Sequence, residues 1–307
     1  HGLPAPFCVP GRSTGGSSFV GGFCCLCRNL PAFTAQSTIS SMKLKPSLFP
    51  AILLIALLTI QLLPGCAPSP ERSRLEHIES IIDEHPDSAM TMLDSVNTAA
   101  LRSDRDRALY GMLLIEALDK NHQDPSNDSL ITSAINYFAD KGERRREMIA
   151  TYYGARVQYL NNDFSHAIVR FFRAKEIAEE LGEHFWHGMA ARGIADIYYK
   201  SFNRAEQLKY AKEEFDNLSL AQRQPYLNYA LLDYATAIYN YGDYSSAVAF
   251  SRQIIDSADA YNDIFLKTDA LKLLGLAKIS TSEFSSATLI FENLLKSTLA
   301  NSSDSLY

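Results

Sequence analysis

The sequence predicts an all-α protein in which helices follow one another as antiparallel pairs. From Glu71 onward, apolar residues keep to helical spacing, as Leu75, Ile78 and Ile82 do at positions i, i+3 and i+7. An alanine recurs with a period of about 40 positions, usually after a turn that contains Asp, Asn or an aromatic residue. A repeat of this length made only of helices is typical of α-solenoids. We therefore expect a solenoid of about six helix pairs.

The individual repeats share an arrangement of small and aromatic residues. In residues 161–174, Phe164 stands three positions before Ala167, Phe171 stands four positions after it, and the small residue Ala174 follows. The same kind of turn recurs before two later alanines, and small residues stand twelve positions before four of them. The recurring alanines are Ala89, Ala134, Ala167, Ala205, Ala247 and Ala287.

This arrangement resembles the tetratricopeptide repeat (TPR), in which small residues let two antiparallel helices approach closely and aromatic residues fill the gap to the next pair. The resemblance implies a set of residues that pack within and between the pairs. The set consists of Ala155, Ala167, Phe171, Ala174, Gly193, Ala205, Ala235, Ala247, Gly275, Ala287 and Phe291.

The chain divides into segments along this pattern. Residues 71–142 are expected to form N-terminal helix pairs, and residues 143–298 to form the TPR-like repeats. One departure is Lys209, which stands where an aromatic residue is expected, so we expect irregular stacking there. Residues 299–307 have the pattern of a turn and the beginning of a further helix, and we expect the chain to continue beyond Tyr307.

Residues 42–65 have the layout of a secretory signal peptide, with two lysines followed by an apolar run and then Cys66. This layout resembles the lipobox of bacterial lipoproteins, in which the cysteine becomes lipidated and N-terminal. The resemblance implies a diacylglycerol thioether and a fatty acid such as palmitate on Cys66, with residues 66–70 as a linker; two or more such chains anchor a protein stably. A transmembrane helix is the alternative, but the apolar run is shorter than the roughly 18 to 20 residues that a bilayer requires.

Residues 1–41 differ from the rest of the chain. They begin at His1, contain no Asp or Glu and are rich in glycine. Because a signal peptide is read at the N-terminus, we expect translation to begin at Met42 and residues 1–41 to be an upstream gene-model artefact. The alternative is a metal or disulfide cluster formed by Cys8, Cys24, Cys25 and Cys27. A structural zinc site, however, has a pair of C-x2-C motifs, and these cysteines do not form such a pair.

Charge and cysteine content limit the classes of function. Four of the 29 basic residues and none of the 35 acidic residues lie before Cys66, which leaves the remainder with a net charge of about −10. An acidic surface repels phosphate backbones, so we expect no binding of nucleic acid. All five cysteines lie at or before Cys66, so the helical part has neither disulfides nor thiol chemistry.

Few residues carry a pattern that predicts chemistry. His184 and His187 stand three apart beside Glu183, which is half of a metal site, but packing or capping at a helix start is the favoured interpretation. The basic run 144–146 is interpreted as a solvated helix face beside acidic neighbours. The helical part has no glycine-rich phosphate loop, no G-x-S-x-G and no H-E-x-x-H, so we expect no catalysis, no metal and no cofactor.

The resemblance implies protein–protein interaction through a concave groove lined by the first helix of each pair. A preformed surface of this kind holds an extended or helical segment of an unidentified protein or peptide at little ordering cost. The residues expected to contact the partner are Tyr152, Arg156, Tyr159, Arg192, Asp196, Tyr199, Asn228, Asp233, Lys272 and Lys278.

Two other functions are compatible with the same pattern. One is the sensor half of a transmembrane TPR regulator whose output domain follows Tyr307. The other is a glycan-binding lipoprotein of the outer membrane, although such proteins are much longer. For the tethered scaffold the expected location is the bacterial cell envelope, with the lipid anchor at Cys66 in the outer membrane and the domain facing the periplasm or the surface.

Overall fold

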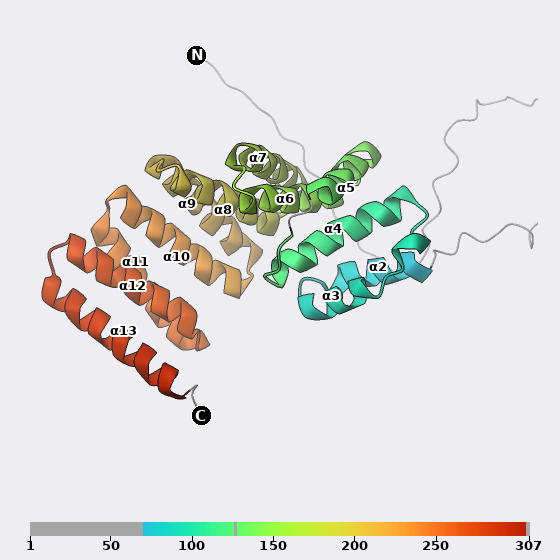
Figure 1. Ribbon diagram of the computed structural model, residues 1–307. Helices are drawn as coiled ribbons and strands as arrows, with labels where there is room; N and C mark the ends of the chain where they lie inside the picture. Colours follow the sequence, from blue (N-terminus) through green and yellow to red (C-terminus); the bar gives the residue numbers. More distant parts are fainter. Residues whose placement is uncertain (1–69, 126–127, 305–307) are drawn as a thin grey trace, which may run out of the picture. The chain divides into compact units, whose positions relative to one another are not determined.

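The computed structural model describes residues 70–125 and 128–304, with side chains described as far as residue 296 (Figure 1). The signal peptide predicted at 42–65, the lipidation site Cys66 and the segment 1–41 lie outside the described residues. Twelve α-helices form six consecutive pairs in the described part, which contains no strand. The predicted all-α solenoid is therefore confirmed.

The two helices of each pair alternate along the chain. The first helices are α2 (Pro70–Ile81), α4 (Asp104–Lys120), α6 (Arg144–Leu160), α8 (His184–Lys200), α10 (Gln224–Tyr241) and α12 (Ile264–Ser280). The second helices are α3 (Pro86–Asp94), α5 (Asp128–Lys141), α7 (Phe164–Leu181), α9 (Arg204–Ala221), α11 (Tyr244–Tyr261) and α13 (Phe284–Asp304). A short 3-10 turn, Thr98–Ala100, joins α3 to α4.

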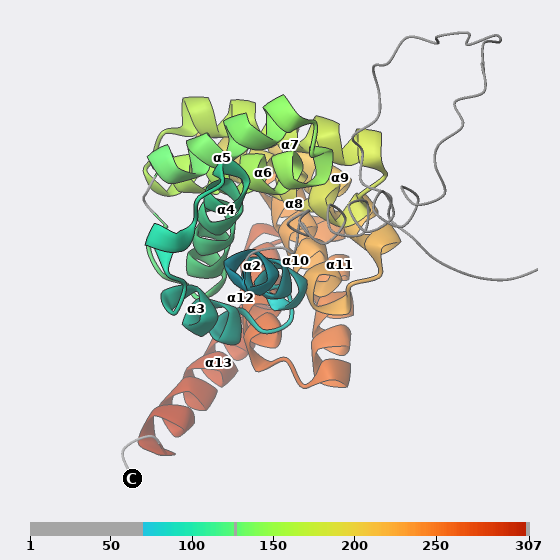
Figure 2. The same ribbon diagram turned by 90° about the vertical axis from the view of Figure 1, so that its right-hand side faces the viewer.

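Each helix packs against the one before it and the one after it in the chain. The first helices also contact one another between pairs, as α4 does with α6, α6 with α8, and α10 with α12. At the N-terminal end, α2 and α3 both pack against α4 (Figure 2). Between α8 and α10 the contact is made by side chains, as between Phe185 and Tyr226. The first helices therefore form a row, and side chains on neighbouring first helices can combine into one surface.

The repeat has a regular length. The helices α4, α6, α8, α10 and α12 begin at positions 104, 144, 184, 224 and 264, and α7, α9, α11 and α13 begin at positions 164, 204, 244 and 284. Each beginning lies 40 positions after the equivalent one before it, so residues with this separation occupy equivalent places in successive repeats. The spacing of the recurring alanines is less regular than this, since consecutive members of that set stand 33 to 45 positions apart.

Among the later repeats, the departure from 40 came from Ala205, which the structure leaves exposed rather than packed. The N-cap side chains fix the register, since Asp163 and Asn203 each accept a hydrogen bond from the backbone N–H three residues later. Counted from these caps, Gln207 is the equivalent of Ala167, and Gln207 is buried. The prediction of Ala205 as a packing residue was therefore wrong, and the glutamine at this place hid the true period.

The remaining residues of the predicted packing set lie at helix contacts. Gly193 is the tightest of them, because a Cβ atom there would stand 2.4 Å from Cζ of Phe171 in the preceding pair. Gly275 makes a similar contact within its own pair, where a Cβ atom would stand 2.6 Å from Cζ of Phe291. Phe171 is fully buried, whereas Phe291 in the last described pair is half-buried. At these points the two helix backbones approach as closely as the aromatic ring allows.

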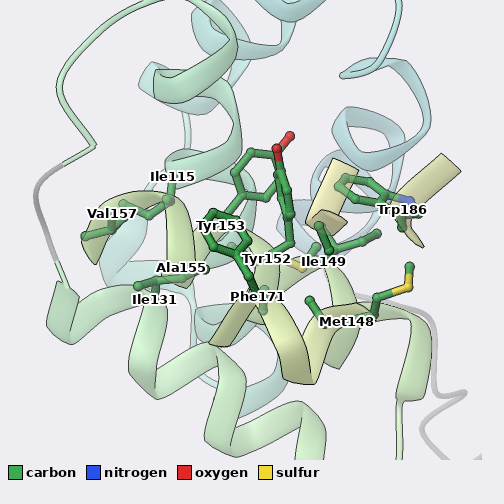
Figure 3. Packing of buried hydrophobic residues seen from close by; sticks show 14 of the residues in the cluster. Ile115, Ile131, Met148, Ile149, Tyr152, Tyr153, Ala155, Val157, Phe171 and Trp186 are labelled. Carbon is green, nitrogen blue, oxygen red and sulfur yellow. The ribbon is translucent and has the colours of Figure 1, made fainter. Parts of the chain in front are cut away.

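Aromatic rings fill the space between α6, α7 and α8 (Figure 3). Tyr152 packs edge-on against Phe171 and Trp186, with ring centroids 5.8 Å and 5.3 Å away. Tyr153 lies beside them, 6.0 Å from Trp186. Edge-to-face pairs of this kind are worth about 0.5–1.5 kcal/mol beyond the burial of their area. They join three successive helices into one rigid core.

The C-terminal helix α13 is longer than the sequence predicts. The turn and new helix expected at 299–307 are not seen in the described residues, because α13 continues without a break through Asp304. The helix carries no proline or glycine in this stretch that would end it.

Among the described helices, none combines the length and the apolar character that crossing a membrane requires.

The variant Gly193→Ala tests the close approach of α8 to Phe171. We expect a loss of about 1–3 kcal/mol in the free energy of unfolding from overpacking, larger than the gain of up to about 1 kcal/mol from the better helix propensity of alanine. Urea unfolding followed by circular dichroism measures it. In a Phe171→Leu background the same substitution should cost less; an equal cost in both backgrounds would show that the ring is not the obstacle.

Candidate partner-binding face

The first helices α4, α6, α8 and α10 together line a cavity of about 260 Å³, which we call the aromatic recess. Its walls combine aromatic rings with charged side chains, so it can hold an amphipathic group. The lining residues are Asp119, Lys120, His122, Tyr152, Tyr153, Arg156, Phe185, Trp186, Met189 and Tyr226.

The aromatic side of the recess comes from the beginnings of α8 and α10. Phe185 packs edge-on against Trp186 and Tyr226, with centroid distances of 5.3 Å and 4.9 Å. The guanidinium carbon of Arg223 lies 4.0 Å from the centre of the Phe185 ring, a cation–π contact. The rings are thus fixed by one another and by a charged neighbour before any ligand arrives.

A row of charged residues runs along the first helices at equivalent repeat positions. Glu116, Arg156 and Asp196 occupy the same place in successive repeats, so acidic and basic side chains alternate from α4 to α6 to α8. Arg156 holds Asp119 in a forked pair, with Nη2 2.9 Å and Nε 3.2 Å from Oδ1. The fork fixes the guanidinium plane and orients α6 relative to α4.

Glu116, the first member of this row, is buried. Its carboxylate accepts a long hydrogen bond from the Tyr153 hydroxyl at 3.4 Å, and the Lys120 ammonium lies 4.0 Å away. Burial raises the pKa of Glu116 to about 8, and the charge of Lys120 only partly opposes that rise. Glu116 is therefore largely protonated at neutral pH.

Beyond the recess, Arg192 stands among three carboxylates. Its Nη2 lies 3.1 Å from Oδ2 of Asp233, and its Nε lies 3.9 Å from Oε1 of Glu214 on α9. Asp196 lies on the same helix as Arg192, and burial together with the charge of Asp233 raises its pKa to about 6. The side chains of Arg192 and Asp233 are 37% and 36% exposed, so this cluster is open to solvent on one side.

The structure brings half of the predicted contact residues together. Tyr152 and Arg156 line the recess, and the charges of Arg192, Asp196 and Asp233 act on one another next to it. Tyr152 contributes mainly to packing, since it is buried. These five residues extend over α6, α8 and α10 as one surface, which we call the first-helix face.

Tyr159 and Tyr199 occupy equivalent repeat positions near the ends of their helices. Tyr159 packs against Phe164 with a centroid distance of 5.5 Å and is half-buried. Tyr199 is 47% exposed and lies beneath the guanidinium group of Arg204, 5.0 Å from the ring centre. Both border the first-helix face without lining the recess.

The other three predicted contact residues are engaged elsewhere. The side-chain oxygen of Asn228 accepts a hydrogen bond from Ser257. Lys272 is exposed and pairs with Asp269, one turn before it on α12. Lys278 is buried rather than presented to a partner, because its ammonium donates to Glu283 at 2.5 Å across the turn between α12 and α13.

Sequence reasoning missed several residues of this face. Phe185, Trp186 and Tyr226 lie at helix beginnings, where residues were assigned to packing or capping. Glu214 lies on a second helix, whereas only first helices were expected to face a partner. The regular repeat spacing would have found Glu214, because it aligns a buried carboxylate with Ala174.

The histidine pair serves the contact between α8 and α9. Nε2 of His187 lies 2.6 Å from Oε1 of Glu213, and Nδ1 of His184 lies 3.0 Å from Oδ1 of Asn217. In the part of the chain that the structure describes, no three His, Cys, Asp or Glu side chains come close enough to hold a metal ion.

The basic run 144–146 is not a simple solvated face. Arg146 is only 20% exposed and forms a forked pair with Glu79 on α2, with Nε 2.8 Å and Nη2 2.7 Å from its oxygens. Arg144 pairs with Glu147 and Glu180, and Arg145 with Glu183. The run therefore joins α6 to helices on both sides of it.

Comparison with solved structures identifies the repeat. RapI in its apo form superposes with a TM-score of 0.59 at 13% identity, over 75% of this chain and 84% of that one. A signal-transduction ATPase with a tetratricopeptide-repeat sensor from Pyrococcus horikoshii matches with a TM-score of 0.57 at 10% identity, over 83% of this chain and 42% of that one. The described part of the chain has a tetratricopeptide-repeat fold.

A third similar structure is that of a complex. It is a Rap protein complexed with competence and sporulation factor, with a TM-score of 0.54 at 13% identity, over 74% of this chain and 65% of that one. At this identity the likeness concerns the TPR fold alone. No family model matches the sequence, and no curated protein matches it.

The variant Glu116→Gln tests the protonation of the buried carboxyl. In the folded chain Glu116 ionises only near pH 8, whereas in the unfolded chain it ionises near its ordinary pKa of 4.5. Its contribution to the free energy of unfolding is fully present below pH 4.5 and is lost as the pH rises toward 8. Relative to wild type, the variant should gain stability by up to about 1.4 kcal/mol per pH unit in this window.

Urea unfolding at pH 5, 6.5 and 8 measures this difference. Glu179→Gln, at an exposed position on α7, provides the control and should leave the pH dependence unchanged. A constant difference between Glu116→Gln and wild type across the three pH values would contradict a protonated Glu116.

Proposed function

We propose that this protein is a non-catalytic binding scaffold that holds a peptide or an extended protein segment against the first-helix face. The observation that carries the proposal is the aromatic recess, which four first helices build together and which adjoins a row of charged residues. A surface that combines apolar rings with charges some distance apart fits a peptide that carries both apolar and charged side chains. It fits a small molecule of a single chemical character less well.

The geometry supports binding without large rearrangement. Forked or paired charges link the helices that form the face, as Arg156 does with Asp119 and Arg192 with Asp233. Ring contacts hold Phe185 and Trp186 in place. A preorganised face loses little conformational entropy on binding, so more of the contact energy appears as affinity.

The TPR fold supports the same proposal at a coarser level. A Rap protein with this fold has been solved with competence and sporulation factor bound. This likeness is one of fold, so the location of the site in the present chain rests on its own recess and charges.

The proposal includes a membrane tether. The lipobox-like sequence before Cys66 supports lipidation, and the residues from 66 to the beginning of α2 at Pro70 would keep the helical domain a few residues from the bilayer. A tethered scaffold would gather a partner at the surface of the cell envelope, in the outer membrane facing the periplasm or the exterior.

Trp186 provides a direct test of partner binding, because it is the one tryptophan in the sequence and lines the recess. Pools of capped octapeptides, each with one fixed residue, should include members that change its emission on binding. Tyr226→Ala should weaken that binding about tenfold or more, since it removes a wall of the recess. Tyr261→Ala, exposed on α11, is the matched control and should bind as wild type does. A library that leaves Trp186 emission unchanged at millimolar peptide would refute the proposal.

Cys66→Ser tests the tether in cells of a bacterium that lipidates proteins. The wild-type protein should partition with the membrane fraction and carry the mass of a diacylated N-terminus. The variant should lose both properties while its helical content, measured by circular dichroism after purification, stays the same. Retention of the variant in carbonate-washed membranes would contradict a lipid anchor at this cysteine.

A further inference from the structure

The cluster around Arg192 contains a buried carboxyl group that the repeat does not require. Ala174, Glu214 and Ile254 follow one another at intervals of one repeat, so the three occupy one place in successive repeats. All three are only 1% exposed. Since small or apolar residues fill this place in the neighbouring repeats, packing alone does not explain a carboxylate there.

Asp233 repeats the exception on the adjoining helix. Its equivalents in the repeats before and after are Gly193 and Leu273, and both are buried. The Asp233 side chain is 36% exposed, yet its Oδ2 atom is buried and faces Arg192. Two neighbouring helices therefore place carboxylates where the repeat elsewhere places apolar or small groups.

The hydrogen-bonding state of Glu214 is unusual for a buried carboxylate. Neither of its oxygens accepts a hydrogen bond from any described residue. The nearest cationic atom is Nε of Arg192 at 3.9 Å, too far for a hydrogen bond. Nη2 of the same guanidinium lies 3.1 Å from Oδ2 of Asp233 in an ion pair, but this oxygen also has no hydrogen-bond partner among the described residues. A buried carboxylate without partners lowers the stability of the fold. The single guanidinium group of Arg192 lies between Asp233 and Glu214, and it could pair fully with either of them.

Neighbouring cations do not balance the cluster. Arg156 acts on Asp196, but it is bound in the fork with Asp119. Lys200 also acts on Asp196, and it lies exposed at the end of α8. Arg192 alone faces Asp196, Glu214 and Asp233 together, so the cluster keeps an excess of negative charge.

We propose that the solvent-facing edge formed by Asp196 and Asp233 binds the guanidinium or ammonium group of a peptide side chain, and that Arg192 then moves onto Glu214. This inference rests on the proposed function and names the chemistry that the first-helix face selects. The incoming cation replaces Arg192 at Asp233, and the released guanidinium gives the buried Glu214 a full partner.

The geometry favours an organic cation over a metal ion. A divalent cation needs converging ligands, and no three carboxylate or histidine side chains of the described residues lie close enough together. An arginine or lysine side chain instead pairs with carboxylates singly and keeps its stem free for apolar contacts. The aromatic recess beside Arg156 offers such contacts to the adjoining residues of the same peptide.

Protonation gives the exchange a second signature. Burial and the charge of Asp233 raise the pKa of Glu214, and burial raises that of Asp196 to about 6. A cation that binds here, and an Arg192 that moves onto Glu214, favour the ionised carboxylates. Binding should therefore release protons, and affinity should rise with pH between about 5.5 and 7.5.

The test uses the same capped octapeptide pools, each with one fixed residue, on the full helical chain. Pools with fixed arginine or lysine should bind tightest. Glu214→Gln should weaken them about tenfold or more while leaving stability equal or higher, because an amide replaces an unpartnered carboxylate. Asp196→Asn, at a half-exposed position, should weaken the same pools without a risk to folding.

Asp216→Asn is the matched control. It removes one negative charge from α9, two residues beyond Glu214, where Asp216 is exposed and pairs with Lys212. Binding of the arginine pools should not change. For an arginine octapeptide and its norleucine counterpart, isothermal titration at pH 5.5 and 7.5 should give tighter binding at the higher pH for the arginine peptide alone.

The outcomes separate this inference from the proposed function. If neutral or acidic pools bind tightest, or if Glu214→Gln and Asp216→Asn behave alike, the cation site is refuted while peptide binding stands. If no pool binds, both fail. Spermidine that binds more tightly than any arginine octapeptide would refute the assignment to a peptide side chain.

Discussion

The contact between a residue without a side chain and an aromatic ring sets the spacing of this molecule. At Gly193 and Gly275 no Cβ atom fits between the helix and the facing phenylalanine. At Gly193 the ring belongs to the preceding pair, so it fixes where α8, the first helix of the next pair, lies; at Gly275 the ring fixes the spacing within one pair. The row of first helices, and every side chain they present, depends on that distance.

The constant repeat length places residues that are 40 positions apart at equivalent points on successive first helices. Because successive first helices begin at a constant interval from α4 onward, Glu116, Arg156 and Asp196 fall on neighbouring helices at the same height. Arg156 and Asp196 attract each other between α6 and α8, whereas Glu116, which is largely protonated at neutral pH, adds little charge to the row. The pattern ends at Thr236, the next equivalent residue, which carries no charge. The acidic excess around Arg192 arises close to that point.

The fold could be predicted from the sequence because its determinants are local. Helical periodicity, small residues and the aspartate or asparagine caps each act within a few positions, and each recurs. The register was harder, since Gln207 occupies the place of an alanine and a nearby exposed residue, Ala205, took its place in the pattern. The N-caps Asp163, Asn203 and Asp243 carry the register more reliably than the small residues do, because a cap marks the helix beginning directly.

The candidate face was only half predictable for a different reason. Residues such as Arg192 and Asp233 are polar on amphipathic first helices, and that pattern marks them as available to a partner. Glu214 lies on a second helix in a position that pattern reasoning assigns to the core, and a single glutamate there has no local signal. Glu214 is recognised as a member of the charged cluster only when equivalent repeats are compared and its distance from Arg192 is known.

Ion pairs also decide from which side a ligand can approach. Asp83, in the turn after α2, lies 2.9 Å from the Lys120 ammonium and 3.8 Å from a nitrogen of Arg223 at the beginning of α10. These contacts draw the N-terminal pair against the side of the recess formed by Lys120, Phe185 and Tyr226. Next to the wall that Tyr152 contributes, Arg192 and Asp233 keep more than a third of their side-chain surface exposed. A peptide would therefore enter past the acidic edge before its apolar residues reach the rings, so charge would select the ligand before apolar burial holds it.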